Sequence, residues 1–405
     1  MDRSSPMRVL VWNQYFPPDT SATASLLRQF VVRAETDGVT VHTIQGNPSY
    51  RPTETARWKP WQLWRRTDQG LMVRSSTRAR DRLSDRARNY VSFAALSSMV
   101  GLFTRCDVIL VMTDPPIAVL GAALVGELRR KPVVYWLQDY HPEFMVGIGR
   151  LAPSAPVRAW SRVHRVAMRR CDRVVAIGRD MRDRLIEAGV RAERIEVVAN
   201  GSAVDWSTEA VPSLALPATD KLVALHAGEI GMRGAWASTV GGARAAADVA
   251  EVVLLGDGVD ADLVRQLAAD TDAVRIEARL PWDEYKARLM GADVLLTMVR
   301  RGAEGYSVPS KTYELFGCGK PIVVIADAST EPARLVTELD CGVVVAPDDD
   351  GRQFGDALRV LAGDPTLRAR LGANALVAKD RYRRDDAFGE VVQILRRAAQ
   401  RSTDS

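Results

Sequence analysis

The sequence predicts an α/β protein with two successive parallel-sheet domains of similar size. At about 150 residues per domain, 405 residues correspond to two or three domains. Short runs rich in Val and Ile alternate with helical stretches, as in parallel sheets that helices cover on both faces. This alternation stops in a polar stretch after Asn200-Gly201 and then begins again, which indicates a second domain.

The first series opens with a strand at 7–12, a helix over about 25–36 and a strand at 39–44. Further strands are expected at 107–113, 132–137, 173–177 and 195–198, and further helices at 158–170 and 181–187. Asp180 is expected to be the N-cap of the last of these helices. Residues 202–220 are rich in Ser, Thr, Pro and Asp without a period, and are interpreted as the linker.

The second series begins after this linker. Its strands are expected at 222–226, 252–255, 274–277, 294–298, 322–325 and 342–345. Gly256-Asp257-Gly258 is typical of a turn from a strand into a helix. An amphipathic helix at 387–399 ends the pattern.

The composition excludes several classes of protein. A net charge of +5 is too small for a nucleic-acid binder with a basic surface throughout. The four cysteines are far apart, which indicates single core thiols in a reducing compartment, and neither they nor the histidines show metal-ligand spacing. Residues 1–12 lack a signal-peptide core, and the apolar runs 91–103 and 108–126 are too short or interrupted by prolines to span a bilayer. A cytoplasmic protein is expected.

The segment 51–90 is unusually basic, with eleven Lys and Arg against four Asp and Glu. It contains Trp58, Trp61 and Trp64 and leads into the apolar run 91–103. Arginines and tryptophans beside an apolar helix suit the interface of a membrane, so the region 51–103 is a candidate for peripheral membrane contact at its cytoplasmic face. A solvated Arg-rich surface beside an ordinary packed helix is equally consistent with the pattern, and both interpretations stay open.

The stretch 304–321 carries the most specific chemistry. It follows the expected strand 294–298, at the edge where open parallel sheets bind ligands. A helix that opens near Ser310 would offer free N–H groups to a phosphate, and Lys311 would add a positive charge. Glu314 would lie on the same helical face, where its carboxylate can accept hydrogen bonds from the diol of a ribose. The alternative is a capped surface helix with Glu314 in a solvent-exposed salt bridge.

Several segments resemble, in order, those of one known family: retaining glycosyltransferases of family four, with the GT-B fold, which build polysaccharides and glycolipids. The Ser307–Glu314 block is similar to the family's donor-site motif in enzymes that act on lipid-linked acceptors. Further similar segments are 8–19, 113–116, 135–143, 198–201, 227–231, 255–258 and 292–294.

The resemblance implies that two Rossmann-like domains face each other across a cleft. Residues 1–205 would bind the acceptor and 206–385 the nucleotide sugar, with a helix at about 386–400 crossing back to the first domain. The implied reaction transfers a hexosyl or N-acetylhexosaminyl group from a UDP-sugar to a lipid-linked saccharide, a glycolipid or a secondary metabolite. It would retain the anomeric configuration and need neither a metal nor a cofactor.

The resemblance also implies a set of donor-site residues. Lys311, Arg233 and the backbone around 228–231 would stabilise the leaving diphosphate, while Arg279-Leu280 would face the base through main-chain groups. In the facing domain, Asp139 is the expected carboxylate at the acceptor or at the transferred sugar; a helix-capping role is its alternative. The full set is Asp139, Gly228, Glu229, Gly231, Arg233, Arg279, Leu280, Ser307, Pro309, Ser310, Lys311 and Glu314.

One departure from the family pattern concerns the first acid of the donor motif. That position is Tyr306 here, and Glu304 lies near it but out of register. Loss of this acid leaves open a catalytically silent nucleotide-binding subunit on the same fold. A nucleotide-sugar 2-epimerase is a further alternative, less favoured because it needs several acid and base groups and only Asp139, His141 and Glu143 cluster. A nicotinamide-dependent dehydrogenase is excluded, because no GxGxxG follows the first strand.

Overall fold

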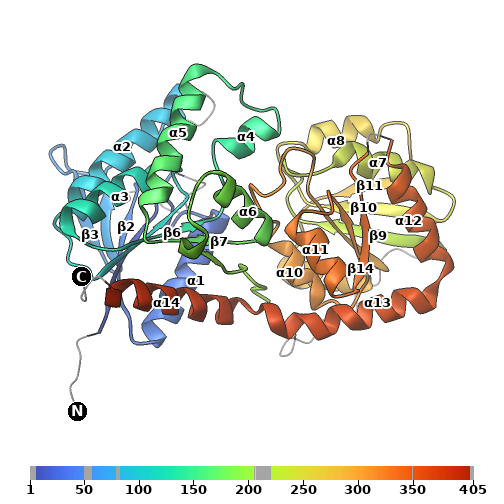
Figure 1. The fold of residues 1–405 in the computed structure, drawn as a ribbon. Helices are drawn as coiled ribbons and strands as arrows, with labels where there is room; N and C mark the ends of the chain where they lie inside the picture. The colour runs from blue at the N-terminus through green and yellow to red at the C-terminus, as the bar shows by residue number, and fades with distance from the viewer. Residues whose placement is uncertain are drawn as a thin grey trace, which may run out of the picture.

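The computed structural model describes residues 6–49, 57–78, 83–204, 206, 220–348 and 350–401. Two sheets lie side by side, each covered by helices (Figure 1). The first has the strand order β3-β4-β2-β1-β5-β6-β7-β8, and all its neighbours are parallel except β3 and β4. Its strands are β1 (Arg8–Trp12), β2 (Thr40–Gln45), β3 (Trp64–Thr67), β4 (Gly70–Val73), β5 (Val108–Met112), β6 (Val133–Leu137), β7 (Arg173–Ala176) and β8 (Ile195–Val197).

The second sheet has the order β11-β10-β9-β12-β13-β14 and is parallel throughout. The predicted fold class of two parallel-sheet domains is thereby confirmed. The strands of this sheet are β9 (Leu222–Ala227), β10 (Ala250–Leu255), β11 (Val274–Glu277), β12 (Val294–Met298), β13 (Ile322–Ile325) and β14 (Gly342–Val345).

Helices cover both faces of the first sheet. Helices α2, α3 and α5 lie next to one another on one face, and α1 lies with α14 on the other (Figure 1). The helices of this half are α1 (Ala22–Thr36), α2 (Leu83–Gly101), α3 (Ala118–Arg129), α4 (Glu143–Gly147), α5 (Ala155–Arg170), α6 (Arg179–Glu187) and the 3-10 turn η1 (Ala192–Arg194). The helices that come later in the chain are α7 (Trp236–Ala245), α8 (Ala261–Leu267), α9 (Trp282–Gly291), α10 (Lys311–Phe316), α11 (Glu331–Glu338), α12 (Arg352–Gly363), α13 (Pro365–Ala378), the 3-10 turn η2 (Lys379–Tyr382) and α14 (Arg384–Arg401).

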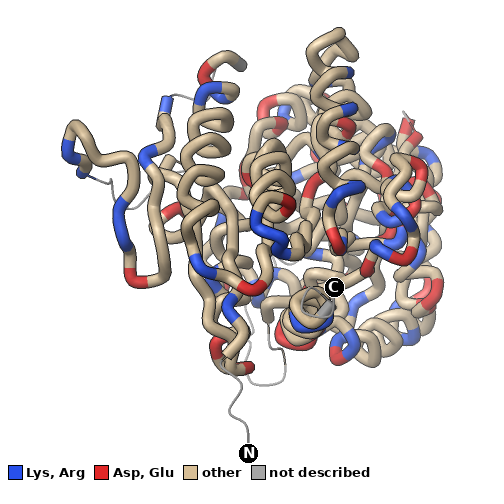
Figure 2. Tube along the Cα trace, turned by 60° about the vertical axis from the view of Figure 1, so that its left-hand side comes forward, with Lys and Arg blue, Asp and Glu red and all other residues tan. Residues whose placement is uncertain are grey.

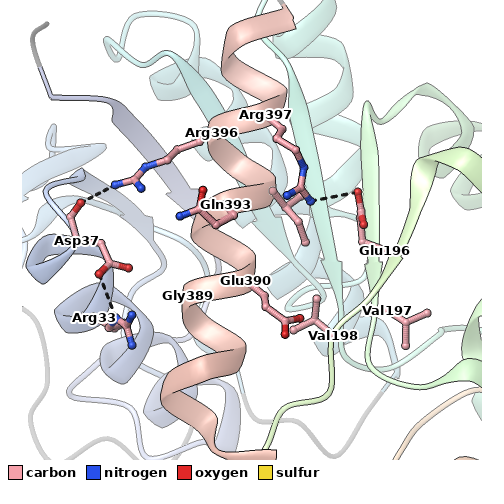
Figure 3. Close-up of a pocket in the computed structure, with 11 residues that line it drawn as sticks. Arg33, Asp37, Glu196, Val197, Val198, Gly389, Glu390, Gln393, Arg396 and Arg397 are labelled. Carbon is pink, nitrogen blue, oxygen red and sulfur yellow. Dashed lines mark hydrogen bonds and ion pairs between the residues drawn. The ribbon is translucent and has the colours of Figure 1, made fainter.

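The last helix returns to the first half of the molecule. Helix α13 packs on the second sheet, and α14 then runs along the first sheet and contacts α1 (Figure 1). Phe388 of α14 makes edge-on ring contacts with Phe30 and Trp136. Polar contacts flank this apolar seam (Figure 3): Arg396 donates to the Asp37 carbonyl at 2.6 Å and Arg397 pairs with Glu196 at 3.5 Å.

An antiparallel hairpin at the edge of the first sheet departs from the predicted pattern. Strands β3 and β4 pair through four residues each, with Gly70 at φ 151° after the turn. Arg65 and Arg66 lie in β3, the outermost strand of the first sheet. Figure 2 shows basic and acidic positions spread along the backbone of the molecule. Charged residues on an edge strand prevent pairing with other chains, but they also hide the apolar alternation by which a strand is recognised.

The expected N-cap at Asp180 is wrong. Helix α6 begins at Arg179, two residues earlier than predicted, with Gly178 as its N-cap, and Asp180 lies inside the first turn. Its buried carboxylate accepts instead from the backbone N–H of Glu331, at 3.0 Å, at the start of α11. Arg179 pairs with the Glu331 carboxylate at 3.0 Å, so these contacts join the two halves of the molecule.

The remaining sequence predictions have mixed outcomes. The single core thiols are confirmed, because all four cysteines are free and buried. Most of the expected linker, 207–219 and residue 205, lies outside the described residues, as do 50–56 and 79–82 of the basic segment. Within the described part of the chain, no helix is long and apolar enough to cross a bilayer.

Candidate active site

A cleft of about 540 Å³ lies between the carboxyl ends of the strands of the two sheets. This is the position at which open parallel sheets bind ligands. From the first half and α14, the cleft is lined by Ala22, Thr23, Ser25, Leu26, Gln138, Asp139, His141, Phe144, Ile177, Asn200 and Arg384. From the second half, it is lined by His226, Glu229, Gly231–Gly234, Trp236, Thr297, Met298, Ser307–Lys311 and Glu314.

Asp139 and Arg233 meet across the cleft. Arg233 Nη2 donates to Asp139 Oδ1 at 2.5 Å, and Arg233 Nε donates to Ser307 Oγ at 2.8 Å. Burial raises the pKa of Asp139, but the charges of Arg233 and His141 and the hydrogen bonds from Ser307 and Arg233 together outweigh burial, so the net shift is downward. The reciprocal attraction raises the pKa of Arg233. The pair is therefore ionised, and 40% of the Arg233 side chain stays exposed.

Asp139 does not cap a helix. The nearest helix, α4, begins at Glu143 with Pro142 as its N-cap. Asp139 instead forms an isolated β-bridge with Ser307, directly before the Lys311 helix. Glu143 points elsewhere, since its carboxylate accepts from the Ser161 hydroxyl, and it does not line the cleft.

Lys311 is held at the floor of the cleft by the end of strand β9. Its Nζ donates to the Ala227 carbonyl at 2.9 Å and lies 3.1 Å from His226 Nε2. Burial lowers the pKa of Lys311 to about 8, although Glu314 and Glu229 oppose the shift. Burial and the charge of Lys311 lower the pKa of His226, so its ring is neutral and its Nε2 accepts a hydrogen bond from the Lys311 ammonium.

Gly228 supports this arrangement from behind. It does not line the cleft, but a Cβ at this position would lie 2.4 Å from Lys311 Nζ. Its φ of 143° is also a conformation that residues with side chains rarely adopt. A glycine is therefore needed for Lys311 to reach Ala227.

Glu314 and Arg384 form the other end of the site. Among the described residues, none donates a hydrogen bond to the Glu314 carboxylate, which opens into the cleft. Burial raises the pKa of Glu314, while Arg384 and Lys311 lower it in part. Arg384, the first residue of α14, also donates to the carbonyls of Asn200 and Gly201 at 3.2 Å. Glu314 is thus free to accept hydrogen bonds from a ligand.

The short helix α10 carries Lys311 and Glu314. It spans six residues, and Ser310, its N-cap, makes no side-chain capping hydrogen bond. So few residues give a weak helix dipole, and the Lys311 ammonium therefore supplies most of the positive field at this point. Ser307, Pro309 and Ser310 line the approach to Lys311.

Several expected or nearby residues lie away from the cleft. Arg279 is exposed and donates to the Asp257 carbonyl at 3.4 Å, and Leu280 packs against the core. Glu304 accepts from the backbone N–H of Gly302 at 2.8 Å. Tyr306 packs against Tyr140, with ring centroids 5.8 Å apart. Glu304 and Tyr306 therefore order the loop that precedes Ser307 without lining the cleft.

The sequence alone did not mark His226, Arg384 or the Gln138–Asn200 pair as site residues. Asn200 Nδ2 donates to Gln138 Oε1 at 2.6 Å, which joins the end of the first half to the cleft. The signal available for His226 was its place at the carboxyl end of a buried strand.

Within the described residues, no group of three or more His, Cys, Asp or Glu is arranged to hold a metal ion.

Two parallel sheets that face each other across this cleft define the GT-B fold. Residues 20–201 match the sequence family described as "Glycosyl transferase 4-like domain". The chain is also similar to solved structures of this fold. One of them, Anabaena Alr3699/HepE in complex with UDP, is 16% identical with a TM-score of 0.65 and covers 96% of this chain and 99% of that chain.

Two curated proteins are similar in sequence. The "Probable glycosyltransferase WbjE" of Pseudomonas aeruginosa is 27% identical over 255 residues, which are 60% of this chain and 64% of that protein. The "Putative colanic acid biosynthesis glycosyl transferase WcaI" of Escherichia coli strain K12 is 23% identical over 81% of this chain and 86% of that protein.

Proposed function

We propose that this protein is a glycosyltransferase of polysaccharide or glycolipid assembly. It would move a sugar from a nucleotide sugar, most simply a UDP-sugar, to a lipid-linked or membrane-associated acceptor, with retention of the anomeric configuration. The observation that carries this proposal is the cleft, which Lys311, Arg233 and Glu314 line together. Among the described residues, none donates a hydrogen bond to the Glu314 carboxylate. The family match, the named relatives and the UDP complex of HepE support it.

The donor is proposed to lie along the second half of the cleft. Lys311 and Arg233 would hold the diphosphate, and Glu314 would accept the ribose hydroxyls one helical turn away. The loop around 228–231 and residues Ser307, Pro309 and Ser310 would supply backbone and hydroxyl groups. Main-chain groups of Arg279-Leu280, which do not line the cleft, are proposed to face a base that extends beyond it.

The chemistry follows from the charges. As the bond between the anomeric carbon and the diphosphate oxygen breaks, negative charge accumulates on the leaving UDP. Fixed cations stabilise that charge in the transition state, so Lys311 and Arg233 can serve without a metal. The acceptor oxygen bonds to the anomeric carbon, and its proton passes to the leaving diphosphate. Asp139, which is ionised and faces Arg233, is the proposed carboxylate at the acceptor hydroxyl or the transferred sugar.

The 2-epimerase alternative receives less support from the geometry. It requires several acid and base groups in the cleft, but of Asp139, His141 and Glu143 only the first two line it. Incubation of a UDP-sugar without an acceptor separates the functions. A transferase gives at most slow hydrolysis, whereas an epimerase gives an isomerised nucleotide sugar.

The Glu314 assignment is tested with nucleotides that lack the ribose hydroxyls. We expect 2′,3′-dideoxy-UDP to bind about 10- to 100-fold more weakly than UDP, since hydrogen bonds to a buried carboxylate contribute about 1.5–3 kcal/mol. In Glu314→Ala, both ligands should bind equally weakly. Titration calorimetry measures the four affinities, with Glu35→Ala on the exposed side of α1 as the control. A full preference for UDP in Glu314→Ala would contradict the assignment.

A pH dependence follows from Lys311, whose pKa is about 8. The affinity for UDP should be nearly constant below about pH 7, fall to about half by pH 8 and approach a tenfold fall per pH unit well above pH 8, as the ammonium loses its proton. Lys311→Arg should remove this alkaline limb, because the guanidinium stays charged. If the affinity of Lys311→Arg for UDP still falls at alkaline pH, the fall is due to another group.

Deprotonation of Lys311 should weaken UDP binding but should increase the stability of the folded protein. Its folded pKa lies below the unfolded value of 10.5, so the unfolded state binds more protons between about pH 8 and 10.5. Stability therefore rises with pH in this window, and the cost of the buried charge is fully present below pH 8. Chemical denaturation at pH 7.5 and 9.5 measures the change.

A further inference from the structure

Glu229 is an acidic residue at a place where the proposed function calls for positive charge. It follows strand β9 and lines the cleft together with Lys311 and Arg233. Its negative charge reaches both of these cations, because it acts to raise the pKa of Lys311 and that of Arg233. A diphosphate held by the two cations would therefore be repelled by Glu229. Binding of the diphosphate does not explain this residue.

The side chain of Glu229 folds back over Gly231. A Cβ at Gly231 would lie 3.1 Å from Cδ and 3.2 Å from Oε1 of Glu229. The glycine thus leaves the room that the carboxylate occupies. Its carbonyl accepts from the indole N–H of Trp236 at 2.9 Å, which holds this part of the loop in place. Because Gly231 also lines the cleft, the Glu229 carboxylate lies against the cleft wall.

Protein stability does not explain Glu229 either. Its side chain is exposed, and among the described residues none donates a hydrogen bond to its carboxylate or forms an ion pair with it. The other two acidic residues of the described cleft lining already have a role. Asp139 pairs with Arg233, and Glu314 is the proposed contact of the ribose. Glu229 is therefore available to a ligand.

The groups of a nucleotide sugar limit what Glu229 can bind. An ionised carboxylate only accepts hydrogen bonds, and the phosphate oxygens are acceptors as well, so Glu229 forms no hydrogen bond with the diphosphate. The ribose hydroxyls are proposed to lie on Glu314. The hydroxyls of the transferred sugar remain. Two neighbouring hydroxyls on a sugar ring offer two donors, which the two oxygens of one carboxylate can accept together.

We propose that the Glu229 carboxylate accepts hydrogen bonds from the hydroxyls of the transferred sugar and selects a neutral, hydroxyl-bearing sugar on the donor. The inference rests on the proposed function, because it requires the diphosphate to lie on Lys311 and Arg233. Glu229 repels UDP alone, whereas hydrogen bonds from the sugar offset that repulsion while the donor is intact. After transfer the sugar no longer covers Glu229, so the repulsion favours release of UDP.

The first test compares UDP with UDP-sugars by titration calorimetry. The probes are UDP-glucose, UDP-galactose, UDP-N-acetylglucosamine and UDP-N-acetylgalactosamine, and the one that binds most tightly is carried forward. Glu229→Gln should bind UDP about three- to sixfold more tightly, the effect of removing one unit charge about 4–6 Å away in water. In Glu229→Ala, the ratio of the Kd of UDP to the Kd of the UDP-sugar should fall about tenfold, as hydrogen bonds to the carboxylate are lost.

Deoxy analogues of the chosen UDP-sugar identify the hydroxyl that Glu229 contacts. Analogues that lack the hydroxyl at C3, C4 or C6 are titrated into the unmodified protein and into Glu229→Ala. At least one analogue should bind the unmodified protein about tenfold more weakly than the parent UDP-sugar. The same analogue and the parent should bind Glu229→Ala equally, because the partner of the missing hydroxyl is gone.

Asp356→Ala is the matched control. Asp356 is an exposed acidic residue of α12, also in the second half of the molecule, and it does not line the cleft. Its loss should leave the affinities for UDP and for the UDP-sugar unchanged. Equal tightening of UDP and UDP-sugar in Glu229→Gln would overturn the proposal, since Glu229 would then only balance the charges of Lys311 and Arg233. Equal effects in the control would overturn it as well.

The design separates this proposal from the proposed function. If Lys311→Met binds UDP as tightly as the unmodified protein, the diphosphate lies elsewhere and the proposed donor site fails. If UDP binding depends on Lys311 but the Glu229 variants keep the original ratio of the two affinities, only the role of Glu229 fails. Binding of UDP without measurable binding of any of the four UDP-sugars would also contradict it. Circular dichroism checks that each variant is folded.

Discussion

Replacement of Lys311 by Met is expected to lower kcat by about a hundred- to a thousandfold, the usual cost of removing one fixed charge donor from a transition state. Lys311 Nζ is held by Ala227 and His226 at the floor of the cleft, where no large movement is needed to meet a diphosphate. Met keeps the length of the side chain and removes only the charge. Initial rates of transfer at saturating donor measure the effect.

The folded state supplies an independent readout for this variant. Because burial lowers the pKa of Lys311, its charge destabilises the protein at neutral pH, and Lys311→Met should melt at an equal or higher temperature. Lys320→Met, nine residues further along the chain and away from the cleft, is the matched control and should keep full activity. An unchanged kcat in Lys311→Met would place the diphosphate elsewhere.

Asp139→Asn is expected to lower kcat by about a hundred- to ten-thousandfold, the range for loss of a group that exchanges or orients a reacting proton. Affinity for UDP should stay the same or increase. In the structure Asp139 holds Arg233 at 2.5 Å, and the neutral amide would release the guanidinium toward the donor phosphates. Transfer rates and UDP titrations on the same preparation measure both effects.

An ion pair on the protein surface, with the same distance between its charged atoms, provides the control for Asp139→Asn. Asp270 pairs with Arg244 at 2.5 Å on the exposed side of the second sheet, so Asp270→Asn removes a similar contact remote from the cleft. It should change neither kcat nor UDP affinity. A parallel loss of UDP binding and kcat in Asp139→Asn would instead mean that the carboxylate serves to position Arg233 for the donor.

The strands were predictable because their burial is continuous. In β5 and β6 every residue is buried, and the chain accordingly shows the unbroken apolar runs Val108–Met112 and Val133–Leu137. The hairpin β3–β4 escaped prediction for the opposite reason. Its outer strand, Trp64–Thr67, has no buried residue, so neither an apolar run nor an apolar face marks it.

Some residues of the candidate site could likewise be predicted from the local sequence, and others could not. Lys311 and Glu314 were predicted because their relation is local, one turn apart on a helix after a buried strand. The contacts of Arg384 with Asn200 and of Lys311 with His226 form only when distant segments fold together. The spacing of residues along the sequence does not indicate these contacts. Asp180 shows a related limit: the residue type suited a cap, but the helix that it caps lies in the other half of the molecule.

The course of α14 has a consequence for protein engineering. Phe388 closes the core against Phe30 and Trp136, so a fragment ending near residue 205 would expose these aromatic rings and should aggregate. A chimera meant to exchange sugar specificity must therefore be spliced twice, in the linker and again before Arg384. The recipient keeps its own final helix, and only the intervening segment is transplanted.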